Sequence, residues 1–330
     1  MREPRFWSAD LDPYSRDAAP VTRALLTPFS WIYAAATAHK LAKASPYDAG
    51  IPVICVGNLT AGGVGKSPIV AALRERLTSV TGQRIATLSR GYGGSEKGPI
   101  KVDPAIHTAR QVGDEPLMLA CSGESWIGAD RAEAGAAMHE AGVQVIIMDD
   151  GHQNPSLHKD LSLIVVDART KFGNGYIIPK GPLREPISKG LARADAVILM
   201  GDGPIPDELS AFSKPILRAK IRPRAPAPSG PLVAFAGIGR PEKLFDSLTE
   251  TGGDVRDAVP FPDHHAYRPD ELKWLRKLAT DHEARLITTE KDYVRLTEAE
   301  RSEMLTFPVE AVFEDAHKLD SLILPLFQNT

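Results

Sequence analysis

The chain has 330 residues, of which 43% are hydrophobic and 25% are charged, and its formal net charge at pH 7 is −3. This length favours two α/β domains over one, and the slightly acidic balance gives no electrostatic case for nucleic-acid binding, which normally needs a basic domain. The two cysteines, Cys55 and Cys121, have neither disulfide nor metal-ligand spacing and indicate a reducing compartment.

The first feature along the chain is an uncharged apolar stretch at residues 24–38, with basic residues on both sides. It is too short to span a membrane, which takes about 20 apolar residues, and it is interrupted by Pro28. A polar leader precedes it and no clear cleavage site follows, which argues against a signal peptide. Two alternatives stay open: a helix packed on the domain, or an interfacial helix with Trp31 and Tyr33 at the polar boundary.

Apolar, β-branched runs then alternate with helical patterns, which is typical of a parallel sheet with crossover helices. We expect strands at residues 51–56, 84–88, 143–148, 161–166 and 194–200, with helices at 68–80 and 131–141. After a proline-rich stretch, a second unit has expected strands at 232–236, 284–289 and 309–313 and a helix at 269–279. The prediction is an α/β protein with a P-loop NTPase-like parallel sheet and a smaller α/β domain. The expected parts are an N-terminal helix region at 1–45, the P-loop domain at 46–205, a linker at 206–231 and the smaller domain at 232–330.

A glycine-rich loop joins the first expected strand to a helix. Such loops curl backbone N–H groups around phosphate oxygens, and the helix N-terminus adds partial positive charge. Lys66 would reach the β- and γ-phosphates of a nucleotide, and the Ser67 hydroxyl would bind magnesium. The strict G-x-x-x-x-G-K-[ST] pattern requires glycine where this chain has Thr60, because the glycines are displaced along the loop. The predicted nucleotide-binding residues are Thr60, Ala61, Gly62, Gly63, Val64, Gly65, Lys66 and Ser67.

Two adjacent carboxylates, Asp149 and Asp150, follow the expected strand at residues 143–148. Acids at the end of a buried strand, downstream of a phosphate loop, supply further magnesium ligands in such enzymes. The carboxyl ends of parallel strands are also where open α/β sheets bind ligands. We therefore expect a magnesium site here, next to the phosphate loop.

Three further polar clusters have ordinary structural explanations on the sequence alone. Asp114 fits the N-cap of a helix, with Pro116 just inside it, where a carboxylate caps free N–H groups. The adjacent His264 and His265 fit surface or capping positions, and Arg184 with Glu185 fits a loop ion pair. A catalytic or binding role for each stays an open alternative at this point.

Together these pieces resemble the tetraacyldisaccharide 4′-kinase family of lipid A biosynthesis. The resemblance covers nearly the whole chain, in the family's order, and the Asp-Asp-Gly and Gly-Pro-Leu-Arg-Glu-Pro stretches are more discriminating than the phosphate loop. The matching stretches are residues 57–67, 88–93, 113–116, 149–154, 173–175, 181–186, 261–265 and 289–292.

The resemblance implies transfer of the γ-phosphate of ATP, with Mg²⁺, to the 4′-hydroxyl of a tetraacylated glucosamine disaccharide 1-phosphate, forming lipid IV-A. It also implies a peripheral or monotopic protein at the cytoplasmic face of the inner membrane, with a two-stranded linker between its domains. Since an acylated substrate sits in the bilayer, the resemblance favours the interfacial alternative for the N-terminal helix. It implies no obligate protein partner.

By the same resemblance, Asp114 and His264 look like a catalytic pair in which the carboxylate orients the base. Asp149 and Asp150 look like magnesium ligands, together with Ser67 and Glu185. Arg184 and Lys66 would neutralise charge on the transferred phosphoryl group. Weaker candidates for substrate contact are Arg90, Tyr92, Arg131 and Gln153. The chain departs from many relatives at His152, Asn154 and Pro155, so the contacts there are open.

The main rival is a membrane-associated P-loop ATPase switch of the partitioning type. In that class the loop lies near the N-terminus and carries an additional early lysine, whereas this chain has Thr60 and Ala61 at that place. A GTPase would carry an Asn-Lys-x-Asp motif, which residues 289–292 match only in part. The two classes differ in one simple property: the ATP turnover of a kinase depends on added acylated disaccharide.

Overall fold

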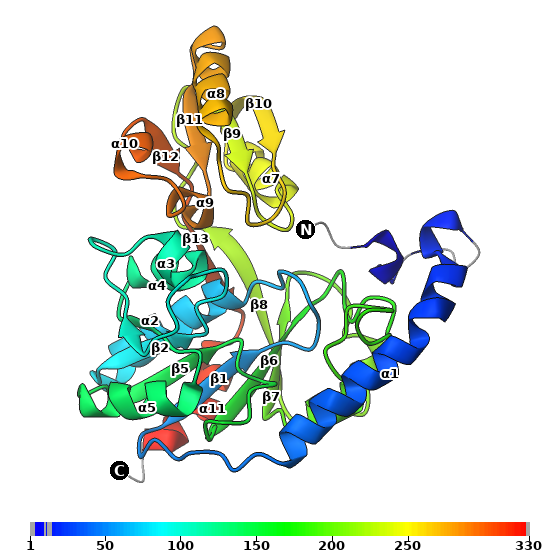
Figure 1. Cartoon of the computed structure of the whole chain (residues 1–330). Coiled ribbons are helices and arrows are strands. Elements are labelled where there is room, and N and C mark those ends of the chain that lie inside the picture. Colours follow the sequence, from blue (N-terminus) through cyan, green and yellow to red (C-terminus); the bar gives the residue numbers. More distant parts are fainter. Residues whose placement is uncertain (1–3, 10, 12–14, 328–330) are drawn as a thin grey trace.

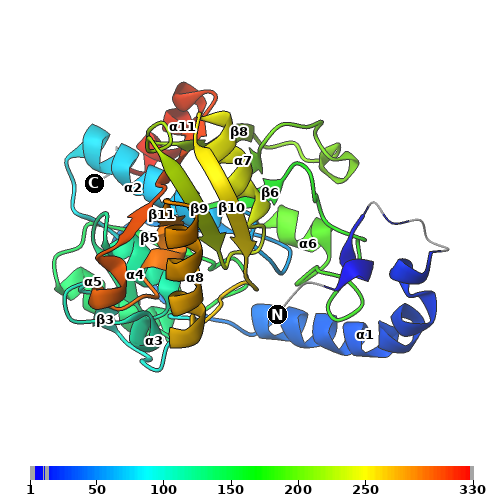
Figure 2. The ribbon, with the colours of Figure 1, turned by 90° about the horizontal axis from the view of Figure 1, so that it is seen from above.

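The computed structural model describes residues 4–9, 11 and 15–327, and shows two α/β units, one above the other (Figure 1). The larger unit carries the sheet that contains the phosphate loop, and the smaller unit has a sheet of its own. A long N-terminal helix lies along the outside of the larger unit (Figures 1 and 2).

The larger sheet is built from β1 (Val53–Gly57), β2 (Ile85–Ser89), β3 (Ile100–Lys101), β4 (Ser125–Ile127), β5 (Val145–Asp149), β6 (Leu161–Asp167), β7 (Ala196–Met200), β8 (Ile216–Pro223) and β13 (Val309–Phe313). Its order is β13-β8-β7-β6-β1-β5-β2-β4-β3. Neighbours pair in parallel except at the two edges, where β3 pairs with β4 and β13 with β8 in antiparallel fashion. The carboxyl ends of the parallel strands therefore meet at one edge, below the smaller unit.

Helices cover both faces of this sheet, because its central strands are apolar on both sides. In β1, Ile54 and Val56 face a cluster that includes α2 (Lys66–Thr81) and α11 (Ala316–Ile323). Cys55 faces the opposite cluster, which includes α5 (Arg131–Glu140). The remaining helices of this unit are α3 (Ala109–Val112), α4 (Asp114–Ala120) and α6 (Ile187–Ala192).

The smaller unit contains β9 (Pro231–Ala236), β10 (Asp254–Pro260), β11 (Arg285–Thr288) and β12 (Met304–Thr306), all paired in parallel in the order β10-β9-β11-β12. Its helices are α7 (Glu242–Glu250), α8 (Pro269–Asp281), α9 (Glu290–Tyr293) and α10 (Glu298–Arg301). The smaller unit has three layers, with its sheet between α8 and α7, because alternate side chains of β9 point to opposite faces. Val233 and Phe235 pack with α8, whereas Leu232 and Ala234 pack with α7. Both patterns follow from the two-residue period of a strand.

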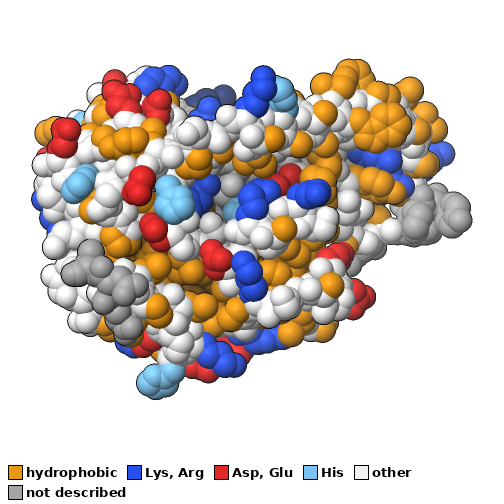
Figure 3. Space-filling view, turned by 90° about the horizontal axis from the view of Figure 1, so that it is seen from below, with side chains coloured by type: hydrophobic (Ala, Val, Ile, Leu, Met, Phe, Trp, Pro, Cys, Tyr) orange, Lys and Arg blue, Asp and Glu red, His pale blue; other side chains and the backbone are white. Residues whose placement is uncertain are grey.

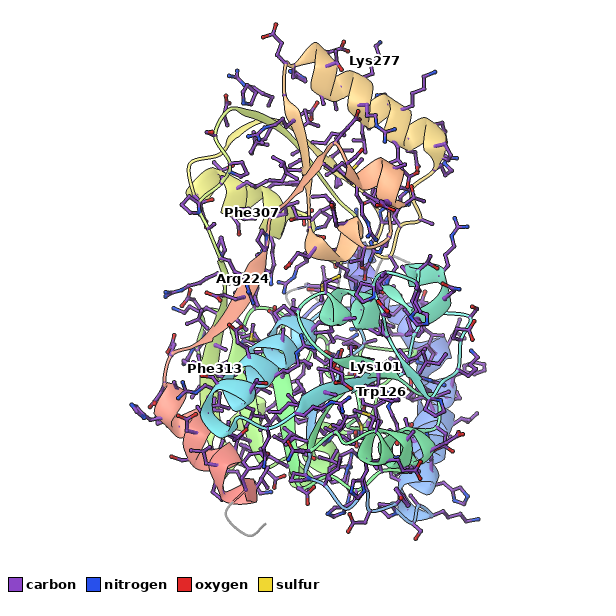
Figure 4. The ribbon with its side chains drawn as sticks, turned by 90° about the vertical axis from the view of Figure 1, so that its left-hand side faces the viewer. Lys101, Trp126, Arg224, Lys277, Phe307 and Phe313 are labelled. Carbon is purple, nitrogen blue, oxygen red and sulfur yellow. The ribbon has the colours of Figure 1, made fainter. Side chains whose placement is uncertain are left out.

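The chain crosses between the two units twice, at adjacent places. It leaves the larger sheet at the end of β8 and returns to it at the start of β13, with Pro223 opposite Val309. Figure 4 shows Arg224 near this crossing, with Phe307 in the smaller unit above and Phe313 in the larger unit below. The paired strands β8 and β13 therefore carry both connections between the two units.

Two sequence-based expectations for this region were wrong. The strand expected at residues 309–313 forms, but it joins the larger sheet and not the smaller one, and α11 packs behind it. The region expected to be a linker contains β8, which pairs with β7. In both cases a strand's own residues do not determine which sheet it joins, because the partner strand lies far away in the sequence. The other expected strands and helices are confirmed within a few residues.

The N-terminal helix α1 spans Pro20–Ala42 and continues through Pro28. Ser30 is its buried side chain; its hydroxyl donates to the Ile177 carbonyl oxygen at 2.8 Å and accepts from the Lys180 N–H at 3.2 Å. Large apolar side chains of α1 point outwards instead: Trp31 is 70% exposed and Ile32 66%. Figure 3 shows hydrophobic side chains gathered at its upper right, where this helix lies. In the part of the chain that the structure describes, no helix is both long and apolar enough to cross a membrane.

Candidate active site

The phosphate loop connects β1 to α2 at the carboxyl edge of the larger sheet. Gly65 caps α2 with φ of +86°, a conformation that favours glycine, and as a glycine it leaves the first N–H groups of the helix without a side-chain partner. The Lys66 ammonium group lies 3.1 Å from the Asn58 side-chain oxygen and 3.4 Å from a carboxylate oxygen of Asp150. Free helical N–H groups beside a lysine form a site for phosphate.

Asp149 and Asp150 lie beside this loop because β5 pairs with β1 in parallel, placing Asp149 opposite Val56. Asp150 has φ of +53°, and Nη1 of Arg184 donates to its two carboxylate oxygens at 2.8 and 2.9 Å. Burial opposes ionisation, but the charges of Lys66 and Arg184 lower the pKa of Asp150 to about 2. Asp150 is therefore ionised and already holds two cations.

Asp149 is 3% exposed, and its Oδ1 has no hydrogen-bond partner among the residues described. Burial, with the nearby charge of Glu115, raises the pKa of Asp149 to about 7. A buried carboxylate oxygen without a partner is costly unless a ligand satisfies it. The oxygens of Asp149, Asp150 and Ser67 suit Mg²⁺, which one or two carboxylates plus phosphate oxygens usually hold. No cluster of three or more His, Cys, Asp or Glu fit for a metal is found within the described ranges, so phosphate oxygens would have to complete such a site.

The loop at residues 181–186 is held against the phosphate loop by a bridge between Leu183 and Thr60. This brings Arg184 to Asp150, as described above. Glu185, expected as a magnesium ligand, is 2% exposed, and both of its oxygens accept from Arg193, at 2.7 and 2.8 Å. The Gln153 side-chain N–H group also donates to Glu185 at 3.0 Å. Glu185 therefore lies next to the site with its carboxylate already engaged.

Asp114 and His264 come from different units and form a hydrogen bond, with 2.9 Å between Asp114 Oδ2 and His264 Nδ1. Burial would raise the pKa of Asp114, but the His264 hydrogen bond and the charges of Lys291 and Arg295 hold it well below its usual range. As an ionised carboxylate only accepts hydrogen bonds, Nδ1 of His264 carries the proton and Nε2 is the basic nitrogen of the neutral ring. The neighbouring His265 contacts Glu271 instead, at 2.8 Å.

Two cations of the smaller unit, which the sequence did not indicate, also reach this pair. Lys291 Nζ lies 3.1 Å from Glu115 Oε1 and 3.3 Å from His264 Nε2. Arg295 donates to Asp114 Oδ2 through Nε at 2.9 Å and through Nη2 at 2.5 Å. Lys291 lies within a stretch that matches the family, which was the available signal. Arg295 lies outside every such stretch.

The weaker substrate candidates lie at varied depths. Tyr92 is 73% exposed and meets the His264 ring edge to face, with 6.2 Å between ring centres. Arg90 is exposed, whereas Arg131 is buried, donates to the Gly128 carbonyl oxygen and carries its charge close to Asp149. The departure at His152 has a packing explanation: its ring is buried and contacts the Gly190 carbonyl oxygen at 3.0 Å.

Known proteins are similar to this chain in sequence and in architecture. The family model for tetraacyldisaccharide-1-P 4′-kinase matches residues 22–328. Tetraacyldisaccharide 4′-kinase of Hyphomonas neptunium is 62% identical over 99% of this chain and 98% of its own length. The enzyme of the same name from Maricaulis maris is 49% identical over 98% of this chain and 96% of its own.

A solved structure agrees with these matches. The crystal structure of LpxK from Aquifex aeolicus in complex with ATP is 27% identical and has a TM-score of 0.73, covering 93% of this chain and 99% of its own. The P-loop kinase fold and the use of ATP expected from the sequence are thereby confirmed. The chain belongs to the tetraacyldisaccharide-1-phosphate 4′-kinase family, whose members are ATP-dependent kinases.

Proposed function

We propose that this chain transfers the γ-phosphate of ATP to the 4′-hydroxyl of a tetraacylated glucosamine disaccharide 1-phosphate, with Asp114 and His264 as its catalytic pair. One observation carries the assignment of the pair: a hydrogen bond joins two residues 150 positions apart, across the two units. An ATPase switch of the partitioning type needs no base of this kind, because it transfers no phosphate to a sugar hydroxyl.

Charged side chains lie between this base and the phosphate loop. Lys66 contacts Asp150, the charge of Glu115 acts on the neighbouring Asp149, and Lys291 joins Glu115 to His264. In this proposal, a nucleotide on the loop presents its γ-phosphate towards the base. The acceptor oxygen forms the new bond to phosphorus as the bond between phosphorus and the β–γ bridging oxygen breaks. The hydroxyl proton passes to Nε2 of His264, and ADP leaves.

Ser67, Asp149 and Asp150 would hold magnesium in this reaction. Mg²⁺ held by these residues would supply positive charge that offsets the negative charge developing on the transferred phosphoryl group. Lys66 adds its charge from the loop. Arg184 acts through Asp150, which it holds in place, and a direct contact with the phosphoryl group would require it to leave that carboxylate.

The test is transfer of labelled phosphate from ATP to purified disaccharide 1-phosphate in detergent. We expect a product labelled at the 4′ position, with a rate that falls to background when EDTA removes the metal. ATP hydrolysis that is equal with and without the disaccharide, and no labelled lipid, would favour the partitioning-type switch instead.

We further propose that α1 lies in the lipid headgroup layer at the cytoplasmic face of the inner membrane. The support is the direction of its side chains: Phe29, Trp31 and Ile32 are each more than half exposed, while the inward side is anchored by Ser30. Full burial of one such side chain contributes about 1.5–3 kcal/mol to the free energy of membrane binding. A few side chains that are only partly buried in the headgroup layer therefore give reversible adhesion. This position would bring the protein to its acylated substrate.

Replacing Phe29, Trp31 and Ile32 together by serine should weaken binding to anionic lipid vesicles by at least about tenfold, the effect of 1.4 kcal/mol. Co-sedimentation measures the binding, and turnover of a detergent-dispersed substrate shows whether the ATP site is intact. Trp274→Ser in α8 is the matched control, because Trp274 is also exposed, at 49%, but lies in the smaller unit. Equal co-sedimentation of the triple variant and the parent would refute the assignment of α1.

A further inference from the structure

We propose that Arg295 is a positioning residue for phosphoryl transfer, which fixes Asp114 and His264 in their working geometry when the two units dock. The inference rests on the proposed function, because it concerns how the base of that reaction is assembled. Arg295 itself lies behind Asp114 and acts through it.

The first support is the way in which one carboxylate oxygen is shared. Asp114 Oδ2 accepts from His264 Nδ1 at 2.9 Å and from Arg295 Nε at the same distance, with Nη2 closer still. The Arg295 and Asp114 side chains are 8% and 9% exposed. A planar guanidinium with two donors on one oxygen restricts the rotation of a carboxylate in a way that a single point charge does not. The rotation of Asp114 in turn determines where the His264 ring points.

The second support is that Arg295 is itself held from behind by the smaller unit. Its Nη1 donates to Asp292 Oδ1 at 2.6 Å and to the Gly237 carbonyl oxygen at 2.8 Å. Asp292 is fully buried and accepts from the Tyr267 hydroxyl at 2.9 Å and from Thr289 at 2.6 Å. These contacts hold the guanidinium group in place independently of Asp114.

The third support is an anchor that Arg295 and the base have in common. The backbone N–H of His264 donates to the Gly237 carbonyl oxygen at 3.1 Å, the same oxygen that Arg295 contacts. His264 has φ of +56°, so its backbone conformation is uncommon and depends on such contacts. Gly237, Arg295 and His264 thus form a socket in the smaller unit that receives Asp114 from α4 of the larger one.

The contact between Arg295 and Asp114 is not needed to hold α9 against the larger unit. Val294, the residue before Arg295, is buried in one apolar cluster with Val112 and Leu117 of the larger unit. Apolar packing therefore already holds α9 against α4, and the donors of Arg295 that face Asp114 are available for orientation. Arg301 is a nearby arginine with a purely structural role, because it donates to the carbonyl oxygens of Tyr293 and Val294.

The experiment compares Arg295→Met, Arg295→Lys and the matched control Arg301→Met in the labelled-phosphate assay with the full chain. We expect Arg295→Met to lower kcat by about 10²-fold, the scale of a misplaced catalytic group, with KM for ATP little changed. The kcat of Arg295→Lys should lie between those of Arg295→Met and the wild type, because lysine keeps the charge but lacks the two parallel donors of the guanidinium group. Arg301→Met should keep nearly the wild-type kcat. In an Asp114→Ala background, Arg295→Met should cause little additional loss, because the carboxylate that it orients is gone.

Circular dichroism establishes which variants fold. If Arg295→Met does not fold, Arg295→Lys decides the question, and a folded lysine variant with wild-type kcat overturns the proposal. So does a loss that multiplies with that of Asp114→Ala, or an equal loss in Arg301→Met. Failure of the wild type and Arg301→Met to phosphorylate the disaccharide would contradict the proposed function instead.

Discussion

Lys66→Ala is expected to lower kcat for transfer to the disaccharide by about 10³-fold, within the range found for cations that stabilise a transferring phosphoryl group. The side chain of Lys66 is 12% exposed and lies against Asp150 and Asn58, at the start of α2. Its removal takes positive charge from the β- and γ-phosphates and leaves Asp150 to Arg184 alone. The loss should appear in kcat more than in KM for ATP, because the charge on the phosphates grows in the transition state.

The measurement is steady-state kinetics in one detergent system, with ATP affinity from calorimetry. Lys66→Arg should keep part of the activity, since it preserves the charge but has a different shape and reach. Lys101→Ala is a suitable control, because Lys101 is 55% exposed and its ammonium group lies 3.6 Å from Glu124, at the sheet edge (Figure 4). Activity of Lys66→Ala within tenfold of the wild type would contradict the role given to the loop.

Asp114→Ala and His264→Ala are each expected to lower kcat by roughly 10²–10⁴-fold, the usual contribution of a positioned acid or base. The double variant should be little worse than the poorer single variant. Two residues that act as one unit give non-additive losses, because the second removal finds the unit already broken. ATP affinity should change far less, since neither residue belongs to the phosphate loop.

Kinetics of all three variants in the same assay test this pair. His265→Gln is the control, because His265 is adjacent in sequence but contacts Glu271 and not Asp114. Losses that multiply in the double variant would show that the two residues have independent roles. A loss in His265→Gln as large as in His264→Ala would show that the base has been assigned to the wrong histidine.

Local sequence patterns predicted the elements that depend on local physics. The apolar run of β1, the glycines before Lys66 and the acids at the end of β5 each have a short-range cause: burial, backbone freedom or a strand end. Because β1 and β5 pair in parallel, their ends meet, and the neighbourhood of Lys66 and Asp150 follows from that topology.

Other features depend on contacts that no short stretch contains. The sequence at residues 309–313 has the β-branched and aromatic residues of a strand, but only its pairing with β8 places it in the larger sheet. Arg295 acquires its environment from Asp114, 181 positions away, so no pattern around it could indicate the contact. Arg184 and Glu185, predicted to meet phosphate and magnesium, contact Asp150 and Arg193 in the structure, and the roles given to them stay predictions.

The place where the chain crosses between its two sheets has an evolutionary and a practical consequence. Since β8 and β13 are hydrogen-bonded neighbours with Pro223 opposite Val309, the smaller unit has the topology of an insertion between two strands of a complete α/β fold. A truncation from the C-terminus could not remove this unit alone, because it would first delete β13 and α11. An internal excision could, because a tight hairpin turn of about two residues closes two such strand ends. Because the two connections lie side by side, any rotation of the smaller unit against the larger one would bend the chain at this single place.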